Sequence, residues 1–185
     1  MEVFDAIAPE HRAFVERQPV FFVATAAAGA HINLSPKGMD CFRVLGPTSV
    51  AWLDVGGSGN ETNAHLLADG RVTVMFCAFD RTALILRFYG RGRPVLPQDA
   101  EWADLHPRFE PLPGTRQIFV VEVDRVQTSC GYAVPQMELV RERPTLSKLH
   151  AKATDAERLA YWRNAEAASI DGLPTRLPTA LPREV

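Results

Sequence analysis

A short segment near residue 34 carries polar side chains at the spacing of a β-strand. Its polar members are Asn33, Ser35 and Lys37, and its apolar members are Ala30, Ile32 and Leu34. Because side chains alternate between the two faces of a strand, one face is predicted to join the core and the other to carry amide, hydroxyl and ammonium donors. Pro36 and Gly38 complete the segment, and Gly38 permits close approach to the backbone. The row suits a phosphate, with a half-solvated strand ending in a turn as the alternative.

A second candidate anion site lies in the glycine-rich stretch 55–62, which leaves a predicted strand and enters a predicted helix. A helix start presents unpaired amide hydrogens and the positive end of the helix dipole. Ser58 and Glu61 have the spacing of a capping box. The candidate ligands are Ser58, Gly59, Asn60, Glu61 and Thr62. The alternative is that these residues only turn and cap the chain.

The same glycines form part of a dinucleotide-binding pattern. Gly57-x-Gly59 follows a strand, and Asp80 lies roughly where a ribose-binding acid is expected. The third glycine position is occupied by Thr62, however, and Asp80 falls in a predicted hairpin turn. The incomplete pattern argues against a parallel dinucleotide-binding fold.

A basic stripe follows on the strand predicted over 83–91. It consists of Arg87, Tyr89, Arg91 and Arg93. The nearly neutral overall charge favours a solvated face or an anionic small molecule over a nucleic-acid platform. Arg87 is the first candidate for a ligand contact. Trp52 is a candidate for stacking on a ring, with burial in the core as the alternative.

No catalytic or metal-binding constellation stands out. The 5 histidines show no metal-ligand spacing, and no G-x-S-x-G nucleophile motif occurs. Cys41, Cys77 and Cys130 are odd in number and lack a C-x-x-C pair, which argues against disulfides and zinc. Cys130 has no His or Lys beside it, so a structural thiol is favoured over a reactive one. Catalytic residues stay unassigned, and no metal is expected.

Strand-like segments dominate the order of elements. Runs rich in β-branched and aromatic residues predict strands over 20–26, 30–35, 49–55, 72–79, 83–91 and 118–127. Helices are predicted over 9–17, 60–69, 97–106 and 144–168. A strand-dominated order with one inserted helix favours a mainly β (α+β) barrel with peripheral helices.

Length and composition set the remaining limits. The 185 residues, 46% hydrophobic, suffice for one core, so 1–170 is predicted to be a single domain. Residues 171–185 form a Pro-rich tail, either a mobile end or an arm across a partner. The formal charge of -2 argues against nucleic-acid and anionic-lipid partners. Without a signal peptide or a membrane-length apolar run, a cytoplasmic location is expected.

Several motifs, taken in order, resemble pyridoxamine 5'-phosphate oxidase-related FMN-binding proteins. They are Phe21-Phe-Val-Ala-Thr25, Asn33-Leu-Ser-Pro-Lys-Gly38, Phe42-Arg-Val-Leu45, Val50-Ala-Trp-Leu-Asp54, Gly57-Ser-Gly-Asn-Glu-Thr62 and Val74-Met-Phe-Cys77. The match covers about residues 20 to 95, and a fainter likeness extends through 129–135. Its most specific part is Ser-Pro-Lys-Gly, then a strand, then Gly-Asn-Glu-Thr.

The resemblance implies an FMN-binding split β-barrel that dimerises with itself and holds two FMN molecules at the dimer interface. By motif, Asn33, Ser35 and Lys37 would hold phosphate or ribityl oxygens. Ser58 to Thr62 would close over the phosphate, so that both candidate anion sites share one occupant. Trp52 and Leu53 would border the isoalloxazine ring, and Arg87 is a weaker transfer.

The implied activity is that of an FMN-dependent oxidoreductase acting on a small substrate, because the flavin itself supplies the hydride and electron chemistry. The true oxidases carry an Arg- and Trp-rich C-terminus that binds the substrate. In this sequence only Arg176-Leu-Pro178 partly resembles it. Their vitamin B6 substrate is therefore not carried over. The alternative on the same fold is a flavin, deazaflavin or haem protein that stores or senses without turnover.

Overall fold

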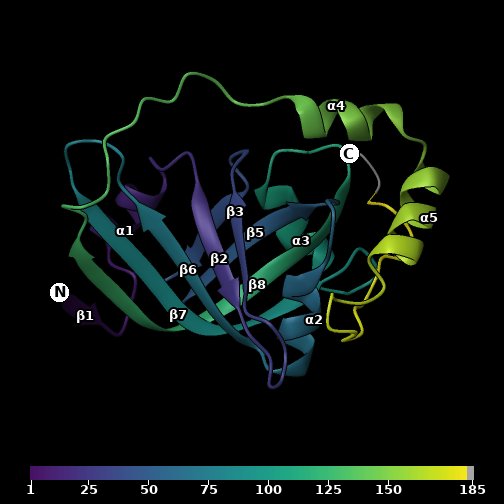
Figure 1. The fold of residues 1–185 in the computed structure, drawn as a ribbon, viewed down its shortest axis with the longest axis horizontal. Coiled ribbons are helices and arrows are strands. Elements are labelled where there is room, and N and C mark those ends of the chain that lie inside the picture. The colour runs from purple at the N-terminus through teal and green to yellow at the C-terminus, as the bar shows by residue number, and fades with distance from the viewer. Residues whose placement is uncertain (183–185) are drawn as a thin grey trace.

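The computed structural model describes residues 1–182, which form a curled antiparallel sheet with helices around it (Figure 1). The sheet has 8 strands in the order β3-β2-β6-β7-β8-β5-β4, with β1 added to β8. The strands are β1 (Glu2–Phe4), β2 (Phe21–Thr25), β3 (Asn33–Lys37), β4 (Phe42–Gly46), β5 (Ser49–Val55), β6 (Arg71–Cys77), β7 (Leu84–Val95) and β8 (Thr115–Cys130). The predicted fold class, a mainly β split barrel with peripheral helices, is confirmed. Strands β1 and β4 are additions to the six predicted segments.

The inner face of the sheet encloses an aromatic core. In β2, Phe21, Val23 and Thr25 are buried and alternate with half-buried residues, as expected for a strand with one covered face. Trp52 on β5 is fully buried and packs against Phe119 on β8, with ring centroids 4.9 Å apart. Burial of such large rings contributes strongly to the hydrophobic driving force for the barrel.

The two longest strands bend where their register shifts. β7 and β8 pair along almost their whole length, with an irregularity between Tyr89 and Gly90. A Cβ atom at Gly90 would overlap the backbone carbonyl of Glu122. Glycine is therefore required at this bulge, which lets the sheet curl back on itself.

Strand β3 differs from the prediction in its bounds and in which of its faces is buried. It begins at Asn33 and lies at an edge of the sheet, paired only with β2 among the described strands. The prediction that its apolar residues join the core is wrong, because Ile32 and Leu34 expose 77% and 65% of their surface. The polar face instead points inward across the sheet, and the apolar face is left open.

The helices lie outside the sheet. They are α1 (Pro9–Val15), α2 (Glu61–Ala68), α3 (Trp102–Leu105) with a 3-10 turn over 106–108, α4 (Thr145–Lys152) and α5 (Asp155–Ala165). The single helix predicted over 144–168 is wrong, because Ala153 is extended and Thr154 caps α5 by accepting from the amide of Glu157. The segment 97–106 is helical only from Trp102. No helix within residues 1–182 is long and apolar enough to cross a membrane.

The C-terminal quarter forms an arm that returns to the barrel. An extended linker, 131–144, leads from β8 to α4, and after α5 the chain runs back beside α2 (Figure 1). His150 bonds the carbonyl of Gly56 at 2.7 Å, and Trp162 packs on the same glycine. A side chain at Gly56 would overlap Trp162, so the arm depends on this bare backbone.

The Pro-rich tail continues this arm along its own chain as far as residue 182. Arg176 exchanges backbone bonds with the side-chain amide of Asn63, and Gln98 donates to the carbonyl of Leu177. These contacts tie the described part of the tail to its own chain, and the predicted arm across a partner stays a prediction. The last part of the predicted tail, 183–185, lies outside the described residues.

Candidate functional site

A polar cavity of about 420 Å³ lies where the inward face of β3, the end of β5, the loop 56–60 and the start of α2 meet. We call it the polar cavity. Its lining consists of Asn33, Ser35, Lys37, Asp54, Val55, Gly57, Ser58, Gly59, Asn60, Glu61, Thr62, Arg116, Phe119 and Ile170. The two candidate anion segments, predicted separately from the sequence, thus come together around one space.

The β3 side of the cavity is held by a chain of hydrogen bonds. The Asn33 amide donates to Thr25 at 3.0 Å and to Thr62 on α2 at 3.1 Å. Ser35 donates in turn to the amide oxygen of Asn33 at 3.0 Å. These bonds fix the polar row of β3 against the helix start, so its donors are pre-positioned.

The helix side differs from the predicted capping box. Helix α2 begins at Glu61 after the N-cap residue Asn60, and no side chain caps it. Ser58 is exposed, so its predicted bond to the helix start is wrong. The Asn60 amide oxygen accepts from Gln117 at 2.8 Å, while its buried nitrogen Nδ2 finds no partner among the described residues. An uncapped helix start therefore faces the cavity, and Asn60, whose buried Nδ2 has no partner among the described residues, is one of its lining residues.

Charged side chains form the floor of the cavity. Arg116 is fully buried and bonds Asp54 at 2.5 Å and also Glu166, which follows α5. Lys37 lies 3.3 Å from the other oxygen of Asp54. Both cations therefore lie at the cavity and are paired with carboxylates, Lys37 with Asp54 and Arg116 with Asp54 and Glu166.

The two carboxylates have opposite pKa shifts. Burial acts to raise the pKa of Asp54, but the charges of Arg116 and Lys37 and bonds from Gln117 and Arg116 outweigh it and lower the pKa to about 2. Burial raises the pKa of Glu166 above its ordinary value despite the attraction of Arg116. Asp54 is therefore the firmer counter-ion of the floor.

Several floor and mouth residues escaped the sequence prediction. Asp54 and Arg116 interrupt buried apolar strands, and a charge in such a position is a signal for a buried pair. Glu166 and Ile170 gave no signal, because they follow a helix more than a hundred residues from β3. Only the fold brings them to the cavity.

Five predicted ligand residues lie elsewhere. Pro36 is on the exposed face of β3, Trp52 and Leu53 are buried in the core, and Arg87 donates to Ser129 on β8 at 3.1 Å. Trp52 thus follows its alternative interpretation, with no ring face open on this chain. Gly38 borders a different cavity.

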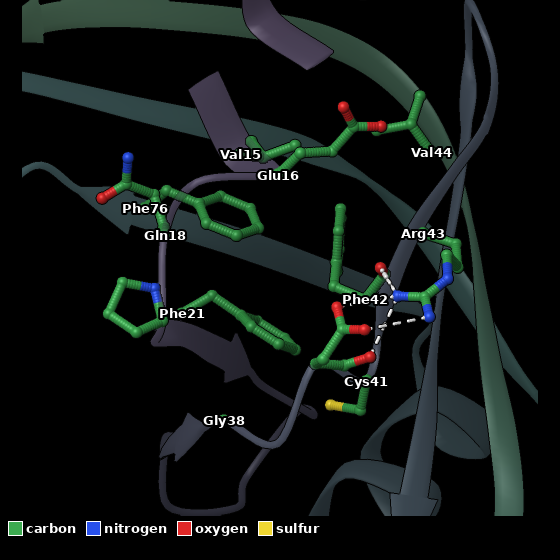
Figure 2. A pocket seen from close by; sticks show the side chains of 12 residues that line it. Val15, Glu16, Gln18, Phe21, Gly38, Cys41, Phe42, Arg43, Val44 and Phe76 are labelled. Atoms are coloured by element: carbon green, nitrogen blue, oxygen red, sulfur yellow. Dashed lines mark hydrogen bonds and ion pairs between the residues drawn. The ribbon is translucent and has the colours of Figure 1, made fainter. Parts of the chain in front are cut away.

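This second space, the aromatic cavity, lies between the end of α1 and β4 and has a volume of about 220 Å³ (Figure 2). Phe21, Phe42 and Phe76 form its wall, with Cys41 at its base. Arg43 at the rim is bound by Asp40 through both carboxylate oxygens, at 3.0 and 3.2 Å. Burial raises the pKa of the Cys41 thiol to about 12, so it is no nucleophile.

Comparisons with known proteins identify the family of this chain. The sequence profile for pyridoxamine 5'-phosphate oxidase matches residues 7–130. The pyridoxamine 5'-phosphate oxidase family protein ustO of Aspergillus flavus is 36% identical over 189 residues, covering 92% of this chain and 76% of that protein.

Solved structures share the fold. HupZ of Group A Streptococcus aligns with a TM-score of 0.53 at 18% identity, over 71% of this chain and 99% of that one. A protein of the pyridoxinephosphate oxidase family from Clostridium acetobutylicum, related to general stress protein 26, aligns at 0.51 with 11% identity, over 65% and 86%. With the matching profile and relative, this chain belongs to the pyridoxamine 5'-phosphate oxidase family.

Proposed function

We propose that the chain binds FMN at the polar cavity and acts as an FMN-dependent oxidoreductase on a small substrate. One observation carries the proposal: two phosphate-type segments, predicted independently, surround one cavity that contains a buried amide donor without a partner among the described residues. Membership of the pyridoxamine 5'-phosphate oxidase family supports a flavin as the occupant.

The donor set fits a phosphate monoester. The first-turn amides of α2 and the side-chain amide of Asn60 are neutral donors among the residues that line the cavity. Lys37 adds a partly exposed ammonium group, and charge-assisted hydrogen bonds are the stronger kind. Arg116, already bonded to Asp54 and Glu166, lies in the floor beneath it. These residues would hold the phosphate of FMN.

The chain's own contribution is binding and orientation. A bound flavin supplies the hydride and electron transfer, so the protein need not provide a catalytic acid or base. Asn33, tied to both β2 and α2, keeps the β3 donors in register with the helix start. Asp54 holds Lys37 and Arg116 toward the phosphate position.

A homodimer with the cofactor at its interface is part of the proposal. The open apolar face of β3, with Ile32 and Leu34 exposed, lies directly behind the polar row that lines the cavity. Adjacent exposed apolar side chains on an edge strand favour a covering partner, and a second copy is the simplest. Light scattering should give twice the monomer mass, and Leu34→Glu should shift it to the monomer; a wild-type monomer would refute this part.

The visible spectrum tests cofactor binding. Protein purified without added cofactor should be yellow, or should take up FMN added in titration. A colourless protein that also rejects FMN would end the proposal. Purification with a deazaflavin or haem spectrum would instead support the corresponding alternative on the same fold.

Turnover needs a separate experiment. The FMN-loaded protein is treated without oxygen with reduced nicotinamide dinucleotides and then exposed to air. Bleaching followed by return of the flavin spectrum is expected for an oxidoreductase. Absence of reduction by any donor would favour storage or sensing without turnover.

A further inference from the structure

The polar cavity has a wall that the barrel does not supply. After α5, residues 167–175 form a small hairpin at the cavity mouth, closed by bonds from Ser169 to Leu173 and from Thr175 to Ala167 at 2.8 and 3.0 Å. Gly172 has a φ of 80°, which suits glycine at its turn. Ile170, in the tip, lines the cavity.

Both ends of this hairpin are anchored in buried surroundings. Glu166, with no exposed surface, bonds Arg116 in the cavity floor. Arg176 exchanges backbone bonds of 2.9 and 3.0 Å with Asn63, which is also fully buried. Buried bonds of this kind are costly to break, so both ends are fixed.

The tip is held by solvated contacts instead. The Ile170 amide donates to the two carboxylate oxygens of Glu61 at 3.0 and 3.2 Å. Asp171 accepts from the backbone amide of His31 at 2.9 Å and bonds its ring at 2.7 Å, with the His31 side chain 81% exposed. Such exposed pairs contribute little stability, so the tip can lift while the two ends stay in place.

The tip also acts on the helix start. Glu61 is the first residue of α2, and a carboxylate there is attracted to the amides of its own helix. The bond from Ile170 holds the Glu61 carboxylate at the mouth, where it does not cap those amides. The Ile170 side chain is 79% exposed and lies at the polar cavity, so its apolar surface is not buried within the described part of the chain.

We propose that residues 167–175 form a latch that closes over the bound ligand at the polar cavity and sets how fast it leaves. The proposal rests on the proposed function. When the latch is closed, Ile170 covers the ligand and Glu61 is turned from the helix amides. When it lifts, the mouth opens and Glu61 is free to compete with the phosphate.

The test measures the dissociation rate of FMN, by mixing the loaded protein with an excess of a flavin-scavenging apoprotein and following fluorescence. Asp171→Asn should raise the rate about two- to fivefold, as expected for loss of an exposed charged contact. Asp69→Asn is the matched control, because Asp69 has the same 18% side-chain exposure and bonds Arg71 at the far end of α2. Its rate should equal that of the wild type. Equal rates for Asp171→Asn and the control would overturn the latch while leaving FMN binding intact.

A second readout does not depend on the ligand. The amide of Ile170 has its acceptor across the mouth, so its hydrogen exchange reports latch opening in the ligand-free protein. It should exchange much faster than the amide of Arg176, and faster still in Asp171→Asn. If the wild-type protein binds no FMN, the proposed function fails. The comparison of the Ile170 and Arg176 exchange rates then tests latch opening by itself. Equal protection of Ile170 and Arg176 would refute it.

Discussion

The polar and aromatic cavities differ in the side chains that line them. The polar cavity is assembled from four segments of the chain and is lined by paired charges and by Asn60, whose buried Nδ2 has no partner among the described residues. The aromatic cavity is a gap among core rings, with its rim cation bound by a neighbouring carboxylate. A cavity with donors left over is prepared for a polar ligand, whereas one with all its polar groups satisfied is a packing defect or an apolar site.

Arg116→Met should have the largest effect, and on the polar cavity alone. It removes the shared partner of Asp54 and Glu166, so the unfolding free energy should fall by about 3 to 5 kcal/mol and FMN affinity should drop with it. Urea unfolding and FMN titration measure both. Arg43→Met, at the rim of the aromatic cavity, should cost less than about 1 kcal/mol. Similar losses in both variants would erase the distinction between the cavities.

Phe76→Ala tests the aromatic side. Phe76 is 1% exposed, so truncation should lower the unfolding free energy by about 3 kcal/mol. The affinity of the folded protein for FMN should stay at the wild-type value, because the ring lies outside the polar cavity. A weakened FMN affinity at a temperature where the variant is fully folded would show that the two spaces act as one site.

Lys37→Ala should weaken FMN binding by about 1 to 3 kcal/mol, the range for a charge-assisted contact. Riboflavin, which lacks the phosphate, provides the control ligand. Its affinity should be the same for variant and wild type. If both ligands weaken equally, Lys37 does not contact the phosphate.

The pH dependence of stability isolates Asp54. Its pKa is about 2 in the folded chain against an ordinary value of 3.8, so its stabilisation is complete above 3.8 and is lost as the pH falls through 2. The shift corresponds to about 2 kcal/mol at most. The stability difference between wild type and Asp54→Asn, measured in urea, should therefore shrink as the pH falls from 5 to 2. A difference that grows in acid would contradict the pairing.

The sequence predicted the polar segments of β3 and of residues 58–62 that line the polar cavity, but not the buried charges beneath them. Alternation around Ser35 and the glycines before Thr62 were sufficient to predict two anion segments, because each depends on local chain geometry. The same alternation led to the wrong face for Ile32 and Leu34, since hydrophobicity alone does not tell a core face from an exposed one. The capping box failed because Ser58 and Glu61 have the right spacing while the helix begins three residues after Ser58.

Local sequence patterns could not predict that the C-terminal arm supplies Glu166 and Ile170 to the polar cavity. Glu166 reaches Arg116 across 50 positions, and Ile170 reaches Glu61 across 109. Neither contact has a periodic signature, and both depend on the arm turning back over Gly56. The domain boundary at residue 170 was predicted from the proline pattern and stays a prediction. The arm itself runs from 131 to 182.

The end of β8 at Cys130 also fixes an order of synthesis. Every strand of the sheet is made before the ribosome reaches the linker, while Glu166 and Ile170 emerge later. A nascent chain that folds as it emerges, as domains generally do, can close its barrel with Arg116 holding only one of its two carboxylates. The barrel strands and the polar row of β3 would then be in place before Ile170 reaches the mouth of the polar cavity.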